Sequence, residues 1–165
     1  MTASVRARPA GPEPEARQAI LDLLADTTWA LDAHDLDAFM AHWADNGVFA
    51  EVTAAGEARR WAGVAAIRAE MAARFAGPVG HQHRLSNHLF LPLPDGRPGW
   101  LVWSYWSTSS RDPAGAVTFA GTGWLRDELI PSDGRWLLTR RSVGPWGTPP
   151  LPHPLSNTPD PADRS

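Results

Sequence analysis

Three histidines stand close together in the stretch GHQHRLSNHLF, residues 80–90. An imidazole can bind a metal ion, move a proton as acid or base, or simply hydrogen-bond to its surroundings. If this stretch is a strand, alternation puts His81, His83 and Asn87 on one face with the leucines, and His88 on the other. We therefore expect His83 and Asn87 to face the core or a pocket, and His88 to face solvent or a subunit contact.

Each interpretation of this strand requires a different partner. A metal site needs three or four ligands, and His81 and His83 supply only two of them. His153 lies apart, in a proline-rich tail. A structural histidine needs only a backbone group to bond. A catalytic histidine needs a carboxylate that fixes its tautomer and stabilises its charged form.

Asp32 is the acidic residue whose position contributes least to the stability expected of the fold. It falls at the C-terminal end of a predicted helix, where a negative charge opposes the helix dipole at a cost of about 0.3–1 kcal/mol. It also lies four residues after Thr28, at the edge of the stripe expected to be buried. Asp35 and Asp37, by contrast, suit the N-cap and first turn of the next helix. Asp32 is therefore a candidate to face the pocket; the alternative is an exposed helix end.

The elements that would position these residues are helices first and strands afterwards. Apolar spacing predicts a helix from Pro14 to about Leu31–Ala33, a short helix from Asp35, and a third over Gly63–Phe75. Alternating segments between Gly, Pro and Asp turns predict strands at 48–52, 81–93, 100–110, 116–130 and 135–146. Short turns between long strands indicate an antiparallel meander. The fold class expected is α+β, a cone-shaped barrel in which a curved antiparallel sheet wraps the helices around a pocket.

The two ends of the chain differ from this domain in composition. Residues 1–13 are rich in Pro, Ala and Arg, which predicts a loose arm before a domain over 14–146. Residues 147–165 contain many prolines, which block regular structure. We expect this tail to be either disordered or an extended strap on a neighbouring subunit.

Composition excludes several kinds of chemistry. All fifteen basic residues among the 165 are Arg, so a Schiff-base or P-loop lysine is absent, and without cysteine there is no thiol nucleophile or thiolate metal site. The net charge of −3 is not concentrated in blocks, which argues against a nucleic-acid or membrane-surface partner. No apolar run reaches transmembrane length and the N-terminus lacks a signal-peptide core, so we expect a cytoplasmic protein. The nine tryptophans would fill a core or wall a pocket for a flat ligand.

Five segments, taken in order, resemble the SnoaL-like branch of the NTF2-like superfamily. They are AILDLLADTTWALDAHDLDAFMAHWADNGVF, GVAAIRAEM, HQHRLSNHLF, GTGWLRDEL and GRWLLTRRSV, and the resemblance covers residues 16–146. It implies an α+β cone with three helices and a curved antiparallel sheet, in agreement with the elements expected above. It also implies a dimer or trimer packed through the outer face of the sheet. We expect that contact to cover at least one of Trp106 and Trp124, which would otherwise form an exposed apolar patch.

Within that superfamily, ALDAHD and HxxxN resemble the scytalone dehydratase, bile-acid dehydratase and dehydrochlorinase group. The resemblance implies that Asp32 orients His83 and that His83 takes a proton from carbon, without a metal or an organic cofactor. We therefore expect the two side chains within hydrogen-bond reach, about 2.6–3.2 Å, and both lining the pocket. The implied activity is a lyase of the dehydratase type acting on a cyclic or polyketide-like small molecule.

The sequence departs from this group in its tyrosines. Leu125 stands where the family usually carries a tyrosine, and Leu31 and Ala33 flank Asp32 where related dehydratases have one. A tyrosine pair that polarises a carbonyl is therefore not available. The residues that would hold the substrate instead are Asn87, Tyr105 and Arg141 for its oxygens and Trp61 and Trp103 as pocket walls.

Three alternatives stay open. Arg141 could instead form a cross-strand ion pair with Asp127 or Glu128. A polyketide cyclase or isomerase would use the same acid and base groups in the same pocket. A non-catalytic ligand-binding or assembly protein would use the same fold, because a fold by itself does not imply chemistry.

Overall fold

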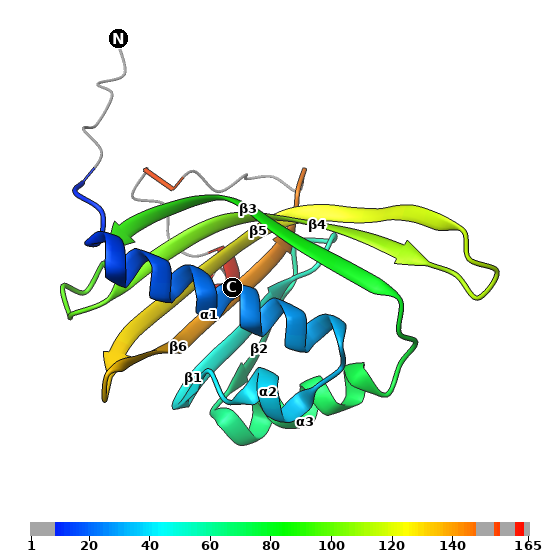
Figure 1. Cartoon of the computed structure of the whole chain (residues 1–165), viewed down its shortest axis with the longest axis horizontal. Helices are drawn as coiled ribbons and strands as arrows, with labels where there is room; N and C mark the ends of the chain where they lie inside the picture. Colours follow the sequence, from blue (N-terminus) through cyan, green and yellow to red (C-terminus); the bar gives the residue numbers. More distant parts are fainter. Residues whose placement is uncertain (1–8, 148–153, 156–160, 164–165) are drawn as a thin grey trace, which may run out of the picture.

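A curved six-stranded sheet wraps around the first helix in the computed structural model, which describes residues 9–147, 154–155 and 161–163 (Figure 1). The helices are α1 Pro14–Asp32, α2 Leu36–Met40 and α3 Val64–Phe75. The strands are β1 Trp43–Val52, β2 Ala58–Ala62, β3 His81–Pro92, β4 Trp100–Arg111, β5 Val117–Ser132 and β6 Arg135–Pro145. A short 3-10 turn, η1, covers Pro161–Asp163. The predicted α+β cone is thus confirmed, as an open sheet in the order β2-β1-β6-β5-β4-β3.

The predicted meander is present in β3 to β6, which pair in antiparallel order. Two features of the sheet were not predicted. β1 pairs with β6 in parallel and with the unexpected strand β2 in antiparallel register. β1 also begins at Trp43, ahead of the strand predicted at 48–52, and its register with β6 shifts between Trp43 and Val48.

The core has two layers, one on each face of the sheet. On the inner face, Ile20 and Leu24 of α1 pack with sheet residues such as Phe90, Val102 and Leu138. On the outer face, a smaller cluster contains Leu91, Leu101, Trp103 and Trp124. Fully burying a side chain of this size contributes about 1.5–3 kcal/mol, so both layers hold the sheet in its curved form.

A bulge in β3 overturns the predicted alternation of faces. The register with β4 shifts between Ser86 and Leu89, and Asn87 adopts a positive φ of 56°. His83 faces the interior before the bulge, as expected, but after it Phe90 enters the inner core and Leu91 the outer cluster. The extra residue reverses which side chains face inward, so the single inner face predicted for His83, Asn87 and Leu91 was wrong.

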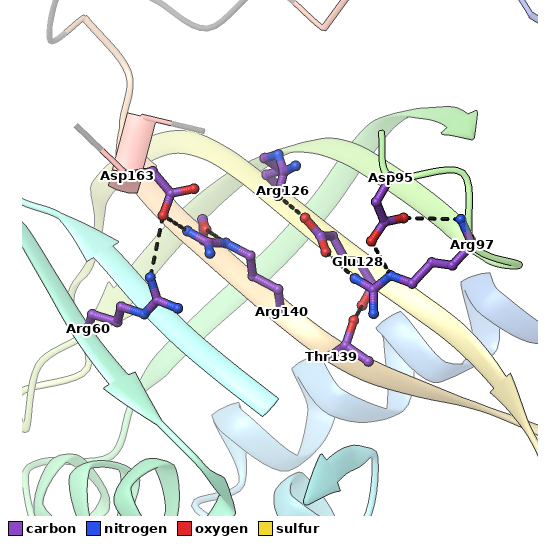
Figure 2. A network of polar contacts seen from close by, with 9 residues as sticks. Arg60, Asp95, Arg97, Arg126, Glu128, Thr139, Arg140 and Asp163 are labelled. Atoms are coloured by element: carbon purple, nitrogen blue, oxygen red, sulfur yellow. Dashed lines mark hydrogen bonds and ion pairs between the residues drawn. The ribbon is translucent and has the colours of Figure 1, made fainter. Parts of the chain in front are cut away.

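The described part of the tail packs on its own chain. Leu155 and Ala162 lie against the outer cluster of Trp103 and Trp124, and Trp124 is only 3% exposed. Asp163 accepts a hydrogen bond from Arg140 at 2.7 Å and lies 3.6 Å from Arg60 (Figure 2). The rest of the tail, 148–153, 156–160 and 164–165, lies outside the described residues.

Ion pairs continue along the outer face beyond the tail. Figure 2 shows Glu128 between Arg126 and Arg97, at 2.7 and 2.9 Å, and Arg97 also contacts Asp95 at 2.6 Å. Arg97 and Asp95 are exposed, and a pair of this kind contributes about 0–1 kcal/mol, whereas Arg126 and Glu128 are largely buried. None of the described helices has the length and apolarity needed to cross a membrane.

Candidate active site

Asp32 and His83 form a hydrogen-bonded pair where the end of α1 meets β3. His83 Nδ1 lies 2.5 Å from Asp32 Oδ1, and the backbone N–H of His83 donates to Oδ2 at 2.8 Å. A carboxylate can only accept, so Nδ1 carries the proton and Nε2 of neutral His83 is left as an acceptor. The predicted contact is therefore present, and its two hydrogen bonds offset the unfavourable place of Asp32 at a helix C-terminus.

His83 lines a cavity of about 420 Å³ between the helices and the sheet. The walls are mainly apolar, with Phe39, Phe75, Leu125 and Trp106 among them. The titratable or charged side chains that line it are His34, Glu51, Arg74, His81, His83 and Arg141. The volume falls in the range of about 300–1,000 Å³ that is usual for small-molecule sites.

Asp32 does not line this cavity, contrary to expectation. It lies behind His83, in an adjoining recess of about 290 Å³ that also touches Trp29 and Gln82. Its side chain is 16% exposed and that of His83 is 27% exposed. Asp32 can therefore act on a ligand only through the imidazole. A more open recess of about 720 Å³, beside Glu13, His42 and Trp136, contains neither residue of the pair.

Arg141 forms the cross-strand ion pair that the sequence left open, and it also lines the cavity. It pairs with Asp127, its neighbour across β5 and β6, through Nε at 2.7 Å and Nη2 at 3.0 Å. Both side chains are buried. Because Asp127 occupies Nε and one N–H of Nη2, the remaining donors, including Nη1, have no hydrogen-bond partner in the described chain and can serve a ligand.

A second ion pair at the cavity was not predicted. Arg74 of α3 donates to Glu51 of β1 and to Glu70, each at 2.8 Å, and its guanidinium lies 5.3 Å from the rings of Phe49 and Trp61. Burial lowers the pKa of Arg74, but the hydrogen bonds to Glu51 and Glu70 outweigh it and hold that pKa above its ordinary value. The i,i+4 spacing signals the bond to Glu70, whereas the bond to Glu51 depends on how α3 docks on the sheet.

Four of the predicted substrate-binding residues lie away from the cavity lining. Trp61 stacks behind Phe49, with ring centres 5.4 Å apart. Trp103 packs on Trp124 in the outer cluster. Tyr105, on the same outer side of β4, is 45% exposed and touches Trp146. Asn87 is exposed in the bulge of β3.

Two further expectations about large or polar side chains are corrected. Trp106, expected on the outer face, lines the cavity and donates from its indole N–H to the carbonyl of Gly144 at 3.3 Å. His88, expected on the solvent side, is half-buried and its Nδ1 lies 2.8 Å from Ser104 Oγ. Burial, followed by the charge of Arg17, lowers the pKa of His88 below its ordinary value.

The described residues contain no group of three or more His, Cys, Asp or Glu side chains arranged to hold a metal ion. The described geometry offers a ring nitrogen of His83 that can accept a proton, donors of Arg141 that Asp127 does not occupy, and a cavity with mainly apolar walls.

Comparison with known proteins identifies the family to which the chain belongs. A family model described as "SnoaL-like domain" matches residues 12–142. No curated protein sequence matches the chain.

Solved structures share the fold at low identity. Aln2 from a Streptomyces species is 22% identical with a TM-score of 0.69, over 82% of this chain and 94% of Aln2. The β subunit of a candidate aromatic-ring-hydroxylating dioxygenase from Novosphingobium aromaticivorans is 14% identical with a TM-score of 0.69, over 79% and 89% of the two chains. A candidate scytalone dehydratase from the same organism is 17% identical with a TM-score of 0.64, over 77% and 81%.

Proposed function

Because the chain belongs to the SnoaL-like domain family, we propose that it is a lyase that eliminates water or a similar leaving group from a cyclic, polyketide-like molecule. The observation that carries the proposal is the 2.5 Å contact between His83 Nδ1 and Asp32 Oδ1 beside the cavity that His83 lines. The reaction needs no organic cofactor, since the proton transfers use only side chains.

His83 is the proposed base. Its Nε2 would take a proton from the carbon next to a carbonyl, and the electrons of that C–H bond would form the double bond as the C–O bond to the leaving hydroxyl breaks. The imidazolium would return its proton to that hydroxyl, which leaves as water, and His83 would again be neutral. Asp32 holds the imidazole in the required tautomer and stabilises the imidazolium that forms. A base positioned in this way contributes about 10²–10⁴-fold to the rate.

Arg141 is the proposed electrophile. Its free N–H groups would donate to the substrate carbonyl, whose oxygen gains negative charge as the proton leaves. The ion pair with Asp127 holds the guanidinium in place on β6, so its donors are already oriented before the substrate arrives. This assignment replaces the tyrosine pair that the chain lacks.

The charges around the cavity favour an uncharged substrate. Arg141 is paired with Asp127, and Arg74 with Glu51 and Glu70. Both arginines of the described lining therefore have a carboxylate partner. An anionic ligand would have to compete with these carboxylates, whereas a neutral ketone would not.

The test is turnover of a bicyclic β-hydroxyketone, β-hydroxytetralone, followed by mass spectrometry and by the absorbance of the aromatic product. We expect loss of water with the wild-type protein and almost none with His83→Ala. His42→Gln, at a histidine outside the cavity, is the matched control. Turnover that survives His83→Ala, or that EDTA abolishes, would contradict the proposal.

The same experiment separates elimination from the closest alternative. A cyclase or an isomerase would use the same base but would leave the mass of its substrate unchanged. Loss of water is therefore the result that favours a lyase, and a product of equal mass is the result that favours the alternative.

A further inference from the structure

His34 lies in the turn that ends α1, two residues after Asp32, and lines the same cavity as His83. Neither the sequence nor the family resemblance assigned it a role. Its backbone conformation, its ring contacts and its unpaired nitrogen together indicate a role in ligand binding.

The backbone at this position suits glycine better than histidine. His34 has a positive φ of 55°, its N–H donates to the carbonyl of Leu31 at 3.2 Å, and the N–H of Asp35 donates to that of Ala30 at 2.9 Å. These two bonds form a Schellman motif, in which the left-handed residue is usually glycine and sometimes asparagine. A histidine costs conformational energy there, so the turn itself does not explain the side chain.

The ring of His34 is held on two sides. Its Nδ1 lies 3.0 Å from the backbone carbonyl of Phe75, at the end of α3. Its face stacks on the ring of Phe75, with centres 5.0 Å apart and planes 12° from parallel. A carbonyl only accepts, so Nδ1 must carry the hydrogen, and Nε2 of the neutral ring is an acceptor.

No hydrogen-bond partner is present for that Nε2 in the part of the chain that the structure describes. The side-chain atoms that are both buried and unpaired there are Trp43 Nε1 and Thr108 Oγ1. Nε2 of His34 is not one of them, so it is accessible to a ligand. His34 therefore presents a rigidly held acceptor at the cavity. Glycine or asparagine would adopt this backbone conformation with less strain than histidine does.

We infer that His34 selects ligands that carry a hydroxyl group, an alcohol or phenol whose O–H donates to Nε2. This deepens the proposed function and rests on it only in taking the cavity as the substrate site. Together with Arg141, which donates, His34 defines a ligand with a hydroxyl and a carbonyl on one ring framework. An ether in place of the hydroxyl has no hydrogen to donate and leaves Nε2 unpaired.

The test is binding rather than turnover, so that its outcome is independent of whether His83 is a base. Calorimetry would compare α-naphthol with its methyl ether, two flat probes that differ in one hydroxyl hydrogen. We expect the wild-type protein to bind the phenol about 3–10-fold more tightly, the effect of one hydrogen bond. His34→Gly and His34→Asn should lose this preference and bind the two probes with similar affinity.

Both variants place a residue that the Schellman position favours, so both should fold, and denaturant unfolding checks this directly. His42→Gln, at a histidine outside the cavity, should keep the preference for the phenol. A wild-type protein that binds the two probes equally, or binds neither, would overturn the inference. So would a preference that survives in both His34 variants.

Discussion

Asp32 and His83 stand 51 residues apart in the chain, yet both carboxylate oxygens of Asp32 are bonded by His83, one by its ring and one by its backbone N–H. The carboxylate therefore fixes the position of the strand as well as the tautomer of the imidazole. Substituting asparagine for Asp32 therefore separates the effect on the fold from the effect on catalysis. The amide oxygen can still accept one of the two hydrogen bonds, but the neutral amide cannot stabilise an imidazolium by charge.

Asp32→Asn should therefore abolish most turnover while keeping the fold. We expect the rate on β-hydroxytetralone to fall about 10²–10⁴-fold, since the amide no longer supports the charged ring. Asp22→Asn, an exposed acid on the same helix, is the matched control and should stay near the wild-type rate. Steady-state kinetics of the two variants, with circular dichroism to confirm folding, would check this; equal rates would remove Asp32 from the mechanism.

The pair of Asp127 and Arg141 should be sensitive to loss of either partner. Asp127 is fully buried, and Asp127→Asn would leave the Arg141 charge without its counterion. Breaking a buried pair in this way costs about 3–5 kcal/mol. Urea unfolding would measure it, with Asp133→Asn in the exposed β5–β6 turn as control. A change below about 1 kcal/mol, the range of exposed pairs, would show that the pair is not effectively buried.

Stability should fall with pH on the acid side of neutrality. Burial lowers the pKa of His42 and His88 from the ordinary value of 6.5, so both stay neutral in the folded protein where the unfolded chain becomes protonated. The unfolded state then binds more protons, and the free energy of unfolding decreases as pH falls through and below that value. Unfolding at about pH 7.5 and about pH 5.5 would measure the decrease.

His88→Gln should make this pH dependence shallower, because one of the two titrating groups is gone. His81→Gln, at an exposed histidine of the same strand, should leave the dependence as in the wild type. A slope unchanged by His88→Gln would show that His88 does not contribute to it.

The tail should control self-association. The homo-oligomer expected from the family resemblance stays a prediction, but its original basis has changed. Trp124 is buried within the outer cluster, on which the described tail residues pack, and Trp106 lines the cavity. Deleting residues 154–165 removes Leu155 and Ala162 from the outer cluster and Asp163 from Arg140. The apolar surface thus uncovered should favour association of copies through this face.

Light scattering of the deleted and complete chains at matched concentrations would check this prediction. We expect a larger mass, or a steeper concentration dependence of mass, after the deletion. Asp163→Asn, which removes only the ion pairs, should have a smaller effect. A monomer in all three samples would contradict both the tail prediction and the expected oligomer.

The sequence by itself determined the kinds of elements and the pair at the centre of the site. Apolar spacing located α1, α3 and the four long strands, because helical and strand periods are set by neighbours in the chain. The misfit of Asp32 at a helix end, joined to the family resemblance, pointed to His83. Both inferences use residue types and their spacing along the chain, which can be read without the tertiary structure.

Only the tertiary structure decided which side chains share the cavity. One extra residue at Asn87 reverses the faces of β3, and the packing of β4 turns Trp106 inward and Tyr105 outward. Periodicity shows that side chains alternate, but the choice of inner face depends on register with a partner strand, where a single-residue shift exchanges every position. The orientation of the His34 ring also depends on the tertiary structure, because its hydrogen bond to the carbonyl of Phe75 forms only when α3 packs beside the end of α1.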